Sequence, residues 1–438
     1  MTTPIFDFVK KYAESKSTRF HMPGHKGALS LGCEAYDITE ISGADVLYSA
    51  DGIIAESEDN LTRLYGSAHS FYSTEGSTLA IKAMLALVSE REGNERPLIL
   101  AARNVHASFV RAAALLDLRV EWIYPENAEH LCSCSITAAD VRAAVESAGE
   151  KPRALYITSP DYLGNMLDIS AISAVCREYG VPLLVDNAHG AYLRFLPEDM
   201  HPITLGAAMC ADSAHKTLPV LTGGAYLHIS KDYAEYTEGA RGALSLFAST
   251  SPSYLTLASL DLCNKRLSED YPEKIVDLVN KSVQIKVKIK DLGFEIADSE
   301  PLKIVIRAGD SLVNHLREQG IEPEFSDRDY TVLMLTPENS DADFDRLISA
   351  LSGFNKSSVV ENTIPHAPKP HKAEMSIREA VLSPCEIIPV EHSECRICAS
   401  PTVSCPPAVP IVISGERITA EDIELFRHYG INTVSVVK

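Results

Sequence analysis

Residues 211–230 read ADSAHKTLPVLTGGAYLHIS and place a single lysine, Lys216, between a histidine and a threonine. The lysine follows a strand-like run of small residues, and a Gly-Gly pair and a second strand-like run come after it. Most lysines lie on solvated helix faces, whereas this one lies between two apolar segments. Burial lowers the pKa of a lysine because desolvation disfavours the ammonium, so an amine placed here could form a Schiff base at neutral pH.

Around this stretch, from about residue 70 to residue 230, short apolar runs alternate with helical patterns. The predicted strands are PLILAA (97–102), VEWIY (120–124), ALYIT (154–158), PLLVD (182–186), AAMCA (207–211) and GAYLHI (224–229). Helical patterns such as TLAIKAMLALVSE lie between several of them. This alternation predicts an α/β fold with a mostly parallel sheet covered by helices on both faces. Ligands of such sheets bind beyond the carboxyl ends of the strands, where Asp186 and Lys216 are expected.

Changes in sequence pattern divide the chain into five predicted segments. Residues 1–15 are a short amphipathic helix, and 16–264 form the large domain that contains the alternating pattern. Residues 265–351 read as a smaller α/β domain. The polar, proline-rich stretch 352–376 is typical of a linker, and 377–438 form a C-terminal domain.

The composition restricts the classes of partner. The chain has 438 residues and a net charge of −20, which disfavours binding to nucleic acid or to an anionic membrane. No apolar run approaches the ~18 residues that span a bilayer, and the first residues have no signal-peptide pattern. We therefore expect a cytoplasmic protein with a small-molecule substrate, no nucleic-acid partner and no membrane contact.

The ten cysteines are scattered along the chain, which favours reduced thiols over a disulfide framework. One cluster, HSECRICASPTVSC, contains His392, Cys395, Cys398 and Cys405. A CxxC with a nearby histidine and a third cysteine is compatible with zinc, but a strong zinc signal has a second compact pair. We expect free thiols in a loop-rich domain and no metal.

A second candidate element is YSTEGSTLAIKAML, which places Gly76, Ser77 and Thr78 at the start of a helical pattern. The first turn of a helix offers free N–H groups and the positive end of the helix dipole, and small hydroxyl residues let a phosphate approach. The alternative is an ordinary Ser/Thr helix cap, which is common.

Two further candidates come from LLVDNAHGAYLRF and NVHASF. Asp186 ends a buried strand run and needs a partner, either a structural arginine such as Arg194 or the protonated nitrogen of a pyridine ring. His106 follows another strand run and on its own reads as a loop histidine. A phosphate-binding helix start, a ring-stacking candidate, a strand-end aspartate and a lysine thirty residues later together suggest pyridoxal 5'-phosphate (PLP).

The ordered motifs resemble those of the bacterial orn/lys/arg decarboxylases, PLP enzymes of the aspartate-aminotransferase fold type. The resemblance runs nearly end to end, through RFHMPGHKG, DITEISGADVL, LYGSAHSFYSTEGST, RNVHAS, TSPDYLGNMLD, VDNAHGAYLRF, SAHKTLPVLTGGAYL, STSPSYLTLASLD and CPPAVPIVISGERIT. It implies a PLP-dependent carboxy-lyase that converts arginine, lysine or ornithine to an amine of the polyamine type. It also implies a short form of the enzyme without an N-terminal receiver-like domain.

The resemblance implies a role for each matching residue. Lys216 matches the Schiff-base lysine, Asp186 the aspartate at the pyridine nitrogen, and His106 the histidine that stacks on the ring. His189 matches the histidine beside that aspartate. The phosphate contacts match the helix start at Gly76 and the residues Ser77, Thr78, Ser213 and His215. The segment with Ser251 and Ser253 matches one that reaches the cofactor of a neighbouring subunit, which implies a homodimer with its active sites at the subunit interface.

Three positions depart from the family pattern. Ala107 stands where the family usually has the lysine of HKS, and Asp161 stands where it has the threonine of PTY. Ser400 stands where the family has a glutamate that could face the basic end of the substrate. These departures leave two alternatives to decarboxylation: an aminotransferase or lyase acting on another amino acid, or a PLP-binding homologue without turnover.

Overall fold

The chain forms two units, each assembled from stretches that are distant in the sequence. The computed structural model describes residues 1–90, 96–126, 130–355, 367–401 and 407–438. The first unit joins residues 1–88 to 182–275, and the second joins 89–181 to 276–438. The boundaries of the five predicted segments stay predictions, and part of the expected linker lies outside the described residues.

The first unit carries the strands that end at the predicted aspartate and lysine. In the order β1-β7-β6-β5 they are β1 (His69–Ser73), β7 (Ala225–Ile229), β6 (Met209–Asp212) and β5 (Leu183–Asp186). β5 and β6 run parallel, with Asp186 beside Ala211, whereas β7 runs antiparallel to β6 and to β1. Every residue of β5, β6 and β7 is buried, which explains their continuous runs without polar alternation.

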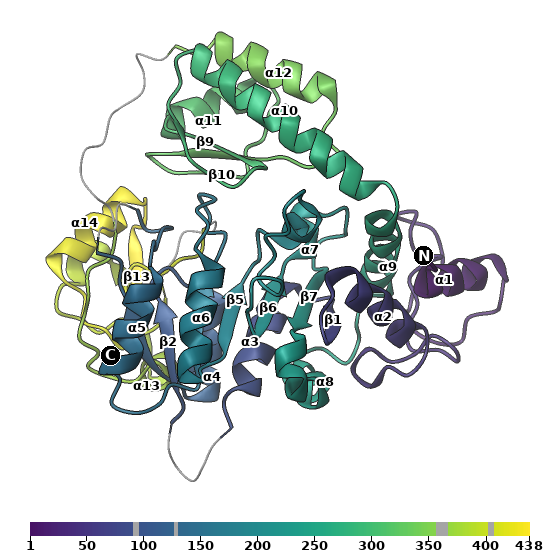
Figure 1. Cartoon of the computed structure of the whole chain (residues 1–438), viewed down its shortest axis with the longest axis horizontal. Coiled ribbons are helices and arrows are strands. Elements are labelled where there is room, and N and C mark those ends of the chain that lie inside the picture. Colours follow the sequence, from purple (N-terminus) through teal and green to yellow (C-terminus); the bar gives the residue numbers. More distant parts are fainter. Residues whose placement is uncertain (91–95, 127–129, 356–366, 402–406) are drawn as a thin grey trace. The chain divides into compact units, whose positions relative to one another are not determined.

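Helices pack around these strands in two groups. α3 contacts β7, β6 and α8, while α1, α2 and α9 pack on one another (Figure 1). Ile5 and Val9 form the buried face of α1, as the amphipathic N-terminal pattern predicts. The helices of this unit are α1 (Pro4–Glu14), α2 (Ile53–Tyr65), α3 (Gly76–Leu87), α7 (Ala214–Thr217), α8 (Thr237–Ser245) and α9 (Tyr254–Ser268).

The second unit contains three parallel strands in the order β4-β2-β3, which are β4 (Ala154–Thr158), β2 (Leu98–Ala102) and β3 (Arg119–Ile123). Helices α4 (Ala107–Leu116), α5 (Ala138–Ser147) and α6 (Ile169–Tyr179) alternate with them along the chain, and α5 packs on α6. This strand–helix alternation is the pattern that the sequence predicts for a parallel sheet.

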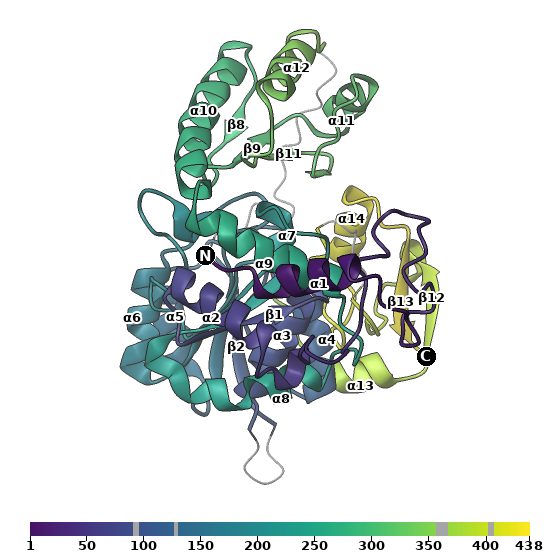
Figure 2. The ribbon, with the colours of Figure 1, turned by 90° about the vertical axis from the view of Figure 1, so that its right-hand side faces the viewer.

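A smaller antiparallel sheet of the second unit is covered on one face by helices (Figure 2). The fully buried Lys303 of this sheet donates from Nζ to the backbone oxygen of Asp161 (2.9 Å). The sheet therefore has a specific contact with the loop that follows β4. Its strands in order are β10 (Phe325–Ser326), β11 (Thr331–Met334), β9 (Lys303–Ile306) and β8 (Ile296–Ala297), and its helices are α10 (Tyr271–Asp291), α11 (Gly309–Glu318) and α12 (Asp341–Ser352).

Arg103, which follows β2, links the C-terminal part of the second unit to the parallel strands of the same unit. Its guanidinium donates to the backbone oxygens of Pro410 (2.9 Å) and Ile411 (2.7 Å). This buried arginine binds carbonyl groups that would otherwise have to be desolvated without partners. The C-terminal elements are α13 (Ile377–Leu382), β12 (Cys385–Pro389), α14 (Ala420–His428) and β13 (Thr433–Val437), and β12 pairs antiparallel with β13.

The predicted α/β fold with mostly parallel strands in its main sheet is thus present in the structure. Each of the six predicted apolar runs overlaps a strand, β2 to β7. The strand β1 was not predicted, because HSFYS carries too few apolar residues for a buried run. Within the described ranges, no helix is both long enough and apolar enough to cross a bilayer.

The contact between α1 and α9 predicts a dependence of stability on pH. Asp261 of α9 accepts the N–H of Phe6 at the start of α1 (3.0 Å), and burial raises the pKa of Asp261 from 3.8 to about 6. Between these values the folded chain keeps a proton that the unfolded chain has released. The free energy of unfolding should therefore fall as the pH rises from about 4 to about 6, by up to about 3 kcal/mol.

Urea titrations at several pH values measure this slope. Asp261→Asn should remove it, because the amide does not titrate. Glu14→Gln, at an exposed position near the end of α1, should keep it. A wild-type slope in Asp261→Asn would contradict the assignment to Asp261.

Candidate functional site

The predicted lysine and two predicted partners lie together at the ends of β5 and β6. Lys216 lies in the short helix α7 that follows β6, and its Nζ is 3.1 Å from Nε2 of His189. β5 ends at Asp186, and His189 belongs to the turn that follows this strand. The carboxylate of Asp186 is buried and accepts the N–H of Ala188 (3.2 Å). The structure therefore brings an amine, an imidazole and a buried carboxylate to one edge of the sheet.

A second group of predicted residues lies at the start of α3. Ser213 donates from Oγ to Oγ of Ser77 in the first turn of α3 (2.7 Å). Gly76 begins this helix with a φ of +71°, and no side chain caps its N-terminus. A Cβ added at Gly76 would meet no atom within 4 Å. The first turn of α3 therefore offers two hydroxyls and backbone N–H groups beside open space.

The loop before α3 is held by a close approach to Gly223. The N–H of Gly76 donates to the backbone oxygen of Gly223 (2.7 Å). Gly223 has a φ of +96°, and a Cβ at this position would lie 2.7 Å from the backbone oxygen of Thr74. The Gly-Gly pair after Lys216 therefore positions the start of α3, a role that the sequence alone did not indicate.

The remaining predicted residues of the first unit have ordinary local roles in the fold. His215 contacts the backbone oxygen of Gly224 through Nδ1 (3.0 Å). Ser253 caps α9 by accepting the N–H of Thr256, whereas Ser251 is exposed. Thr78 is half-buried in the first turn of α3. Arg194, considered as a partner of Asp186, pairs with Asp199 instead.

His106 lies in the second unit, where it caps α4 by accepting the N–H of Ser108 at Nδ1 (3.1 Å). The next residue is the departure Ala107, which is buried and donates its N–H to the backbone oxygen of Ala408 (2.8 Å). The departure Ser400 is exposed. A lysine at position 107 would need space for its longer side chain beside the buried hydrogen bond between Ala107 and Ala408.

The cysteine-rich cluster is only partly visible, because Cys405 lies outside the described residues. His392 and Cys395 are exposed, whereas the thiol of Cys398 is buried and points to the backbone oxygens of Ser400 (3.4 Å) and Val412 (3.7 Å). Burial raises the pKa of Cys398 to about 12, so this thiol is protonated at neutral pH.

Four buried side chains that the sequence analysis did not select lie behind the turn after β5. Asp212, the last residue of β6, contacts Nε2 of His201 (3.0 Å) and Nε2 of His228 (3.4 Å). It also accepts from Nδ2 of Asn187 (2.7 Å). Burial by itself would raise the pKa of Asp212, but the two histidines outweigh it and hold this pKa below its usual range. Asp212 is therefore a buried anion.

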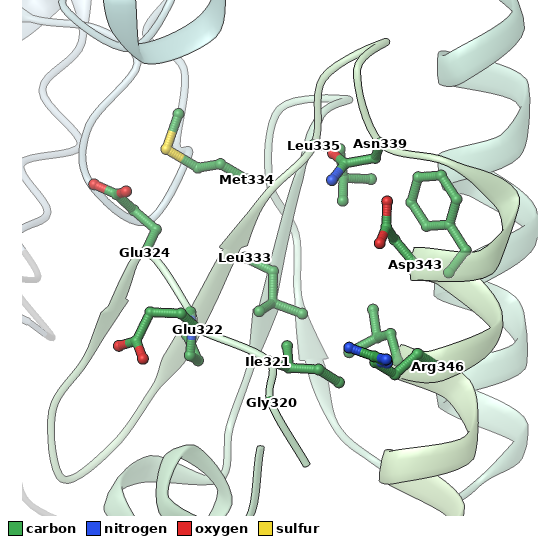
Figure 3. Close-up of a pocket in the computed structure, with 13 residues that line it drawn as sticks. Gly320, Ile321, Glu322, Glu324, Leu333, Met334, Leu335, Asn339, Asp343 and Arg346 are labelled. Atoms are coloured by element: carbon green, nitrogen blue, oxygen red, sulfur yellow. The ribbon is translucent and has the colours of Figure 1, made fainter. Parts of the chain in front are cut away.

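A cavity of about 450 Å³ lies elsewhere, in the small domain between β11, α12 and residues 320–324 (Figure 3). Its carboxylates include Glu322, which pairs with Arg317, and Glu324, which accepts from Tyr162. Among the described residues that line this cavity, none is a predicted site residue. The candidate site is therefore the group around Lys216 and not this cavity.

Comparison with known proteins identifies the family. The model of the Orn/Lys/Arg decarboxylase major domain matches residues 3–308, and that of the C-terminal domain of the same family matches residues 357–431. The chain belongs to the Orn/Lys/Arg decarboxylase family. The family predicted from the ordered motifs is thus confirmed, and with it the prediction of an amino-acid decarboxylase.

Relatives within the Orn/Lys/Arg decarboxylase family match over nearly the whole chain. An arginine decarboxylase of Bacillus subtilis is 30% identical and covers 96% of this chain and 92% of its own length. An arginine decarboxylase of Bacillus anthracis is 29% identical and covers 97% and 92%. A constitutive lysine decarboxylase of Escherichia coli is 23% identical over 65% of this chain and 42% of its own length.

Solved structures of lysine decarboxylases share the fold. The enzyme LdcF of Francisella novicida superposes with a TM-score of 0.84 at 18% identity, covering 100% of this chain and 81% of that chain. The constitutive enzyme of Escherichia coli gives 0.81 at 18% identity, covering 100% and 82%. The predicted fold class, that of aspartate-aminotransferase-type enzymes, is confirmed by these matches.

The close approach at Gly223 predicts that a methyl group there disturbs the start of α3. Gly223→Ala should destabilise the fold by about 1–3 kcal/mol, because the backbone is in the left-handed region and the new Cβ collides with Thr74. Gly242→Ala is the matched control. Gly242 lies inside α8 with open space around it, so alanine should be neutral or stabilising by up to about 1 kcal/mol. Equal denaturation midpoints for the two variants would contradict this role of Gly223.

Proposed function

We propose that the chain is a PLP-dependent decarboxylase of a basic amino acid, with Lys216 as the residue that holds the cofactor. The observation that carries the proposal is the contact of 3.1 Å between Nζ of Lys216 and Nε2 of His189, beside the buried Asp186. An imidazole at this distance from an amine can exchange a proton with it, which is the step that a lysine needs when it acts as a nucleophile and as a proton carrier.

The residues around Lys216 fit the chemistry of PLP. The uncapped first turn of α3, with Ser77 and Ser213 beside the open space at Gly76, suits a phosphate dianion. The buried carboxylate of Asp186 is a suitable partner for a protonated ring nitrogen, because pairing with an opposite charge offsets the cost of burying a charged group. His106 would cover the ring, as the family resemblance implies.

When bound, PLP supplies an electron sink for the electron pair that remains on Cα as CO₂ leaves. The residues of the chain would then have four tasks. Asp186 would keep the ring nitrogen charged, and the first turn of α3 would hold the phosphate. Lys216 would hold the cofactor and would carry a proton at Nζ, which it could pass to Cα of the substrate. His189, 3.1 Å from this amine, would return a proton to Nζ.

Arginine is the first substrate to test, with lysine and ornithine next. The full-length relatives named arginine decarboxylase support this order, because they match more of this chain than the relatives named lysine decarboxylase. Because Ala107 and Ser400 depart from the family pattern, the alternative is a different PLP-dependent reaction on another amino acid. An aminotransferase would form a keto acid from the substrate, whereas a decarboxylase releases CO₂.

We also propose that the active form is a homodimer. The segment 19–37 exposes large apolar side chains, among them Phe20 (93% exposed) and Leu31 (89%). Clustered exposed apolar side chains of this size mark interaction surfaces. The segment is braced from within, because the carboxylate of Glu34 accepts the N–H groups of residues 30–32 and its pKa falls to about 2.

Lys216→Ala tests the central role. We expect loss of the absorbance of bound PLP and a fall in CO₂ release from carboxyl-labelled arginine of about 10³-fold or more, because no other group replaces the amine. Lys231→Ala, at an exposed position, should keep both. Full activity in Lys216→Ala would refute the proposal. Keto-acid formation without CO₂ in the wild type would favour the aminotransferase.

Leu31→Asp tests the dimer. A charge within the exposed apolar segment should raise the dimer dissociation constant by about a hundredfold or more, as measured by sedimentation at several protein concentrations. Ile387→Asp in β12, where the side chain is also exposed, should leave the dissociation constant unchanged. A dimer of wild-type affinity in Leu31→Asp, or a monomeric wild type, would contradict the proposal.

A further inference from the structure

Three buried side chains donate hydrogen bonds to the buried anion Asp212. They are His201 through Nε2 (3.0 Å), Asn187 through Nδ2 (2.7 Å) and Cys210 through Sγ (3.2 Å). Nε2 of His228 lies 3.4 Å from the same carboxylate. All of these side chains are fully buried. An ionised carboxylate is tolerated in such a place only when its lone pairs are occupied by donors.

The far side of this cluster is also fixed. Nδ1 of His228 contacts Oγ of Ser70 (2.7 Å), and the ring of Tyr65 stacks on His228 at 4.2 Å. Burial lowers the pKa of His228, which outweighs the opposing effect of Asp212, so this imidazole is neutral near pH 7. The cluster is thus a buried network of hydrogen bonds around the carboxylate of Asp212.

Residues of these types can also ligate a metal ion, but the hydrogen bonds favour a network without one. His201 accepts the N–H of Ile203 at Nδ1 (3.4 Å), which places its own proton on Nε2, the atom that faces Asp212. A metal would need the lone pair of Nε2 instead. Oδ1 of Asp212 is likewise occupied by the amide of Asn187.

Asn187 joins this network to the candidate site. It lies between Asp186 and His189 in the sequence, and its N–H donates to the backbone oxygen of Ala211 (3.0 Å). Its side chain points away from the site to Asp212. The turn closes with the N–H of Gly190 donating to the backbone oxygen of Asn187 (2.8 Å). A Cβ at Gly190 would lie 2.0 Å from Oδ1 of Asn187, so glycine is required for this inward orientation of the amide.

We propose that Asp212 is a positioning residue, which holds the amide of Asn187 and thereby fixes the turn that presents Asp186 and His189 to the cofactor and to Lys216. The inference rests on the proposed function, since it assigns a purpose to this turn in the same site. Asp212 does not touch the reacting atoms. It acts by keeping the two side chains on either side of Asn187 in one orientation.

The first test compares Asp212→Asn and Asn187→Ala with the wild type, all as the full chain titrated with PLP. We expect each variant to bind PLP about tenfold to a hundredfold more weakly, because each loses a buried hydrogen bond to a charged group. We also expect the pH at which the absorption band of bound PLP titrates to shift, because Asp186 and His189 are no longer held. Ser70→Ala removes a contact at the far end of the same network, so it should lower thermal stability but leave affinity and band unchanged.

A double-mutant cycle tests the path through Asn187. If Asp212 acts through this amide, the double variant should bind PLP no more weakly than the worse single variant. If the double variant weakens PLP binding by the product of the two single effects, the inference is overturned. It is also overturned if the variants of Asp212 and Asn187 lose stability but keep the PLP affinity and the absorption band of the wild type. Gly190→Ala displaces the amide from the other side and decides the question if Asp212→Asn does not fold. If the wild-type protein does not bind PLP, the proposed function is refuted. This outcome is distinct from failure of the inference about Asp212, in which the wild type binds PLP and the variants bind it equally well.

Discussion

The parallel register of β5 and β6 is the constraint on which the candidate site depends. Because Asp186 lies beside Ala211, the turn after β5 and the helix α7 after β6 leave the sheet at the same level. Lys216 then reaches His189 on one side of this turn, and Asp212 reaches Asn187 on the other. A shift of the pairing by one residue would turn Asp186 to the opposite face of the sheet and would separate both contacts.

Most of the fold could be predicted from the sequence, because buried parallel strands leave continuous apolar runs. The parallel strands β2, β4, β5 and β6 follow this rule, and the buried antiparallel strand β7 also has a continuous run. β3 is the exception, because Arg119 and Glu121 are exposed. A long charged helical stretch in the sequence indicated the smaller α/β domain. β1 was not predicted because HSFYS contains three polar residues beside Phe71 and Tyr72, so its polar side chains need hydrogen bonds within the core. Ser70 of this strand, for example, is bound to His228.

The candidate site could be predicted in its parts more readily than in its connections. Lys216, Asp186 and the start of α3 stand at strand or helix ends, positions that indicate function from local pattern alone. The links between them, such as Ser213 to Ser77 and Gly223 to Gly76, join residues far apart in the chain. His228 was not selected because it lies within a buried strand, where one polar residue in an apolar run appears as an exception. Asp212 was not selected although it ends β6, directly after the predicted run AAMCA.

The positions that depart from the family pattern lie in structurally different settings. Ala107 is buried and its N–H is bound to Ala408 of the C-terminal part, close to the carbonyl groups that Arg103 holds. Ser400 is exposed and imposes little on its surroundings. Asp161 is buried with its carboxylate turned inward to Asn165, and its backbone oxygen bound by Lys303. A substitution at Ser400 is therefore compatible with the fold, whereas one at Asp161 or Ala107 must also satisfy its packing.

The carboxylate of Glu34 has a consequence for assembly. Because it binds three consecutive N–H groups inside its own segment, the loop that carries Phe20 and Leu31 is ordered before any partner arrives. A surface prepared in this way loses little conformational entropy when it is covered, so association begins from a conformation close to the final one. In the proposed homodimer, the pairing rate would then depend mainly on how often two such surfaces meet in the right orientation.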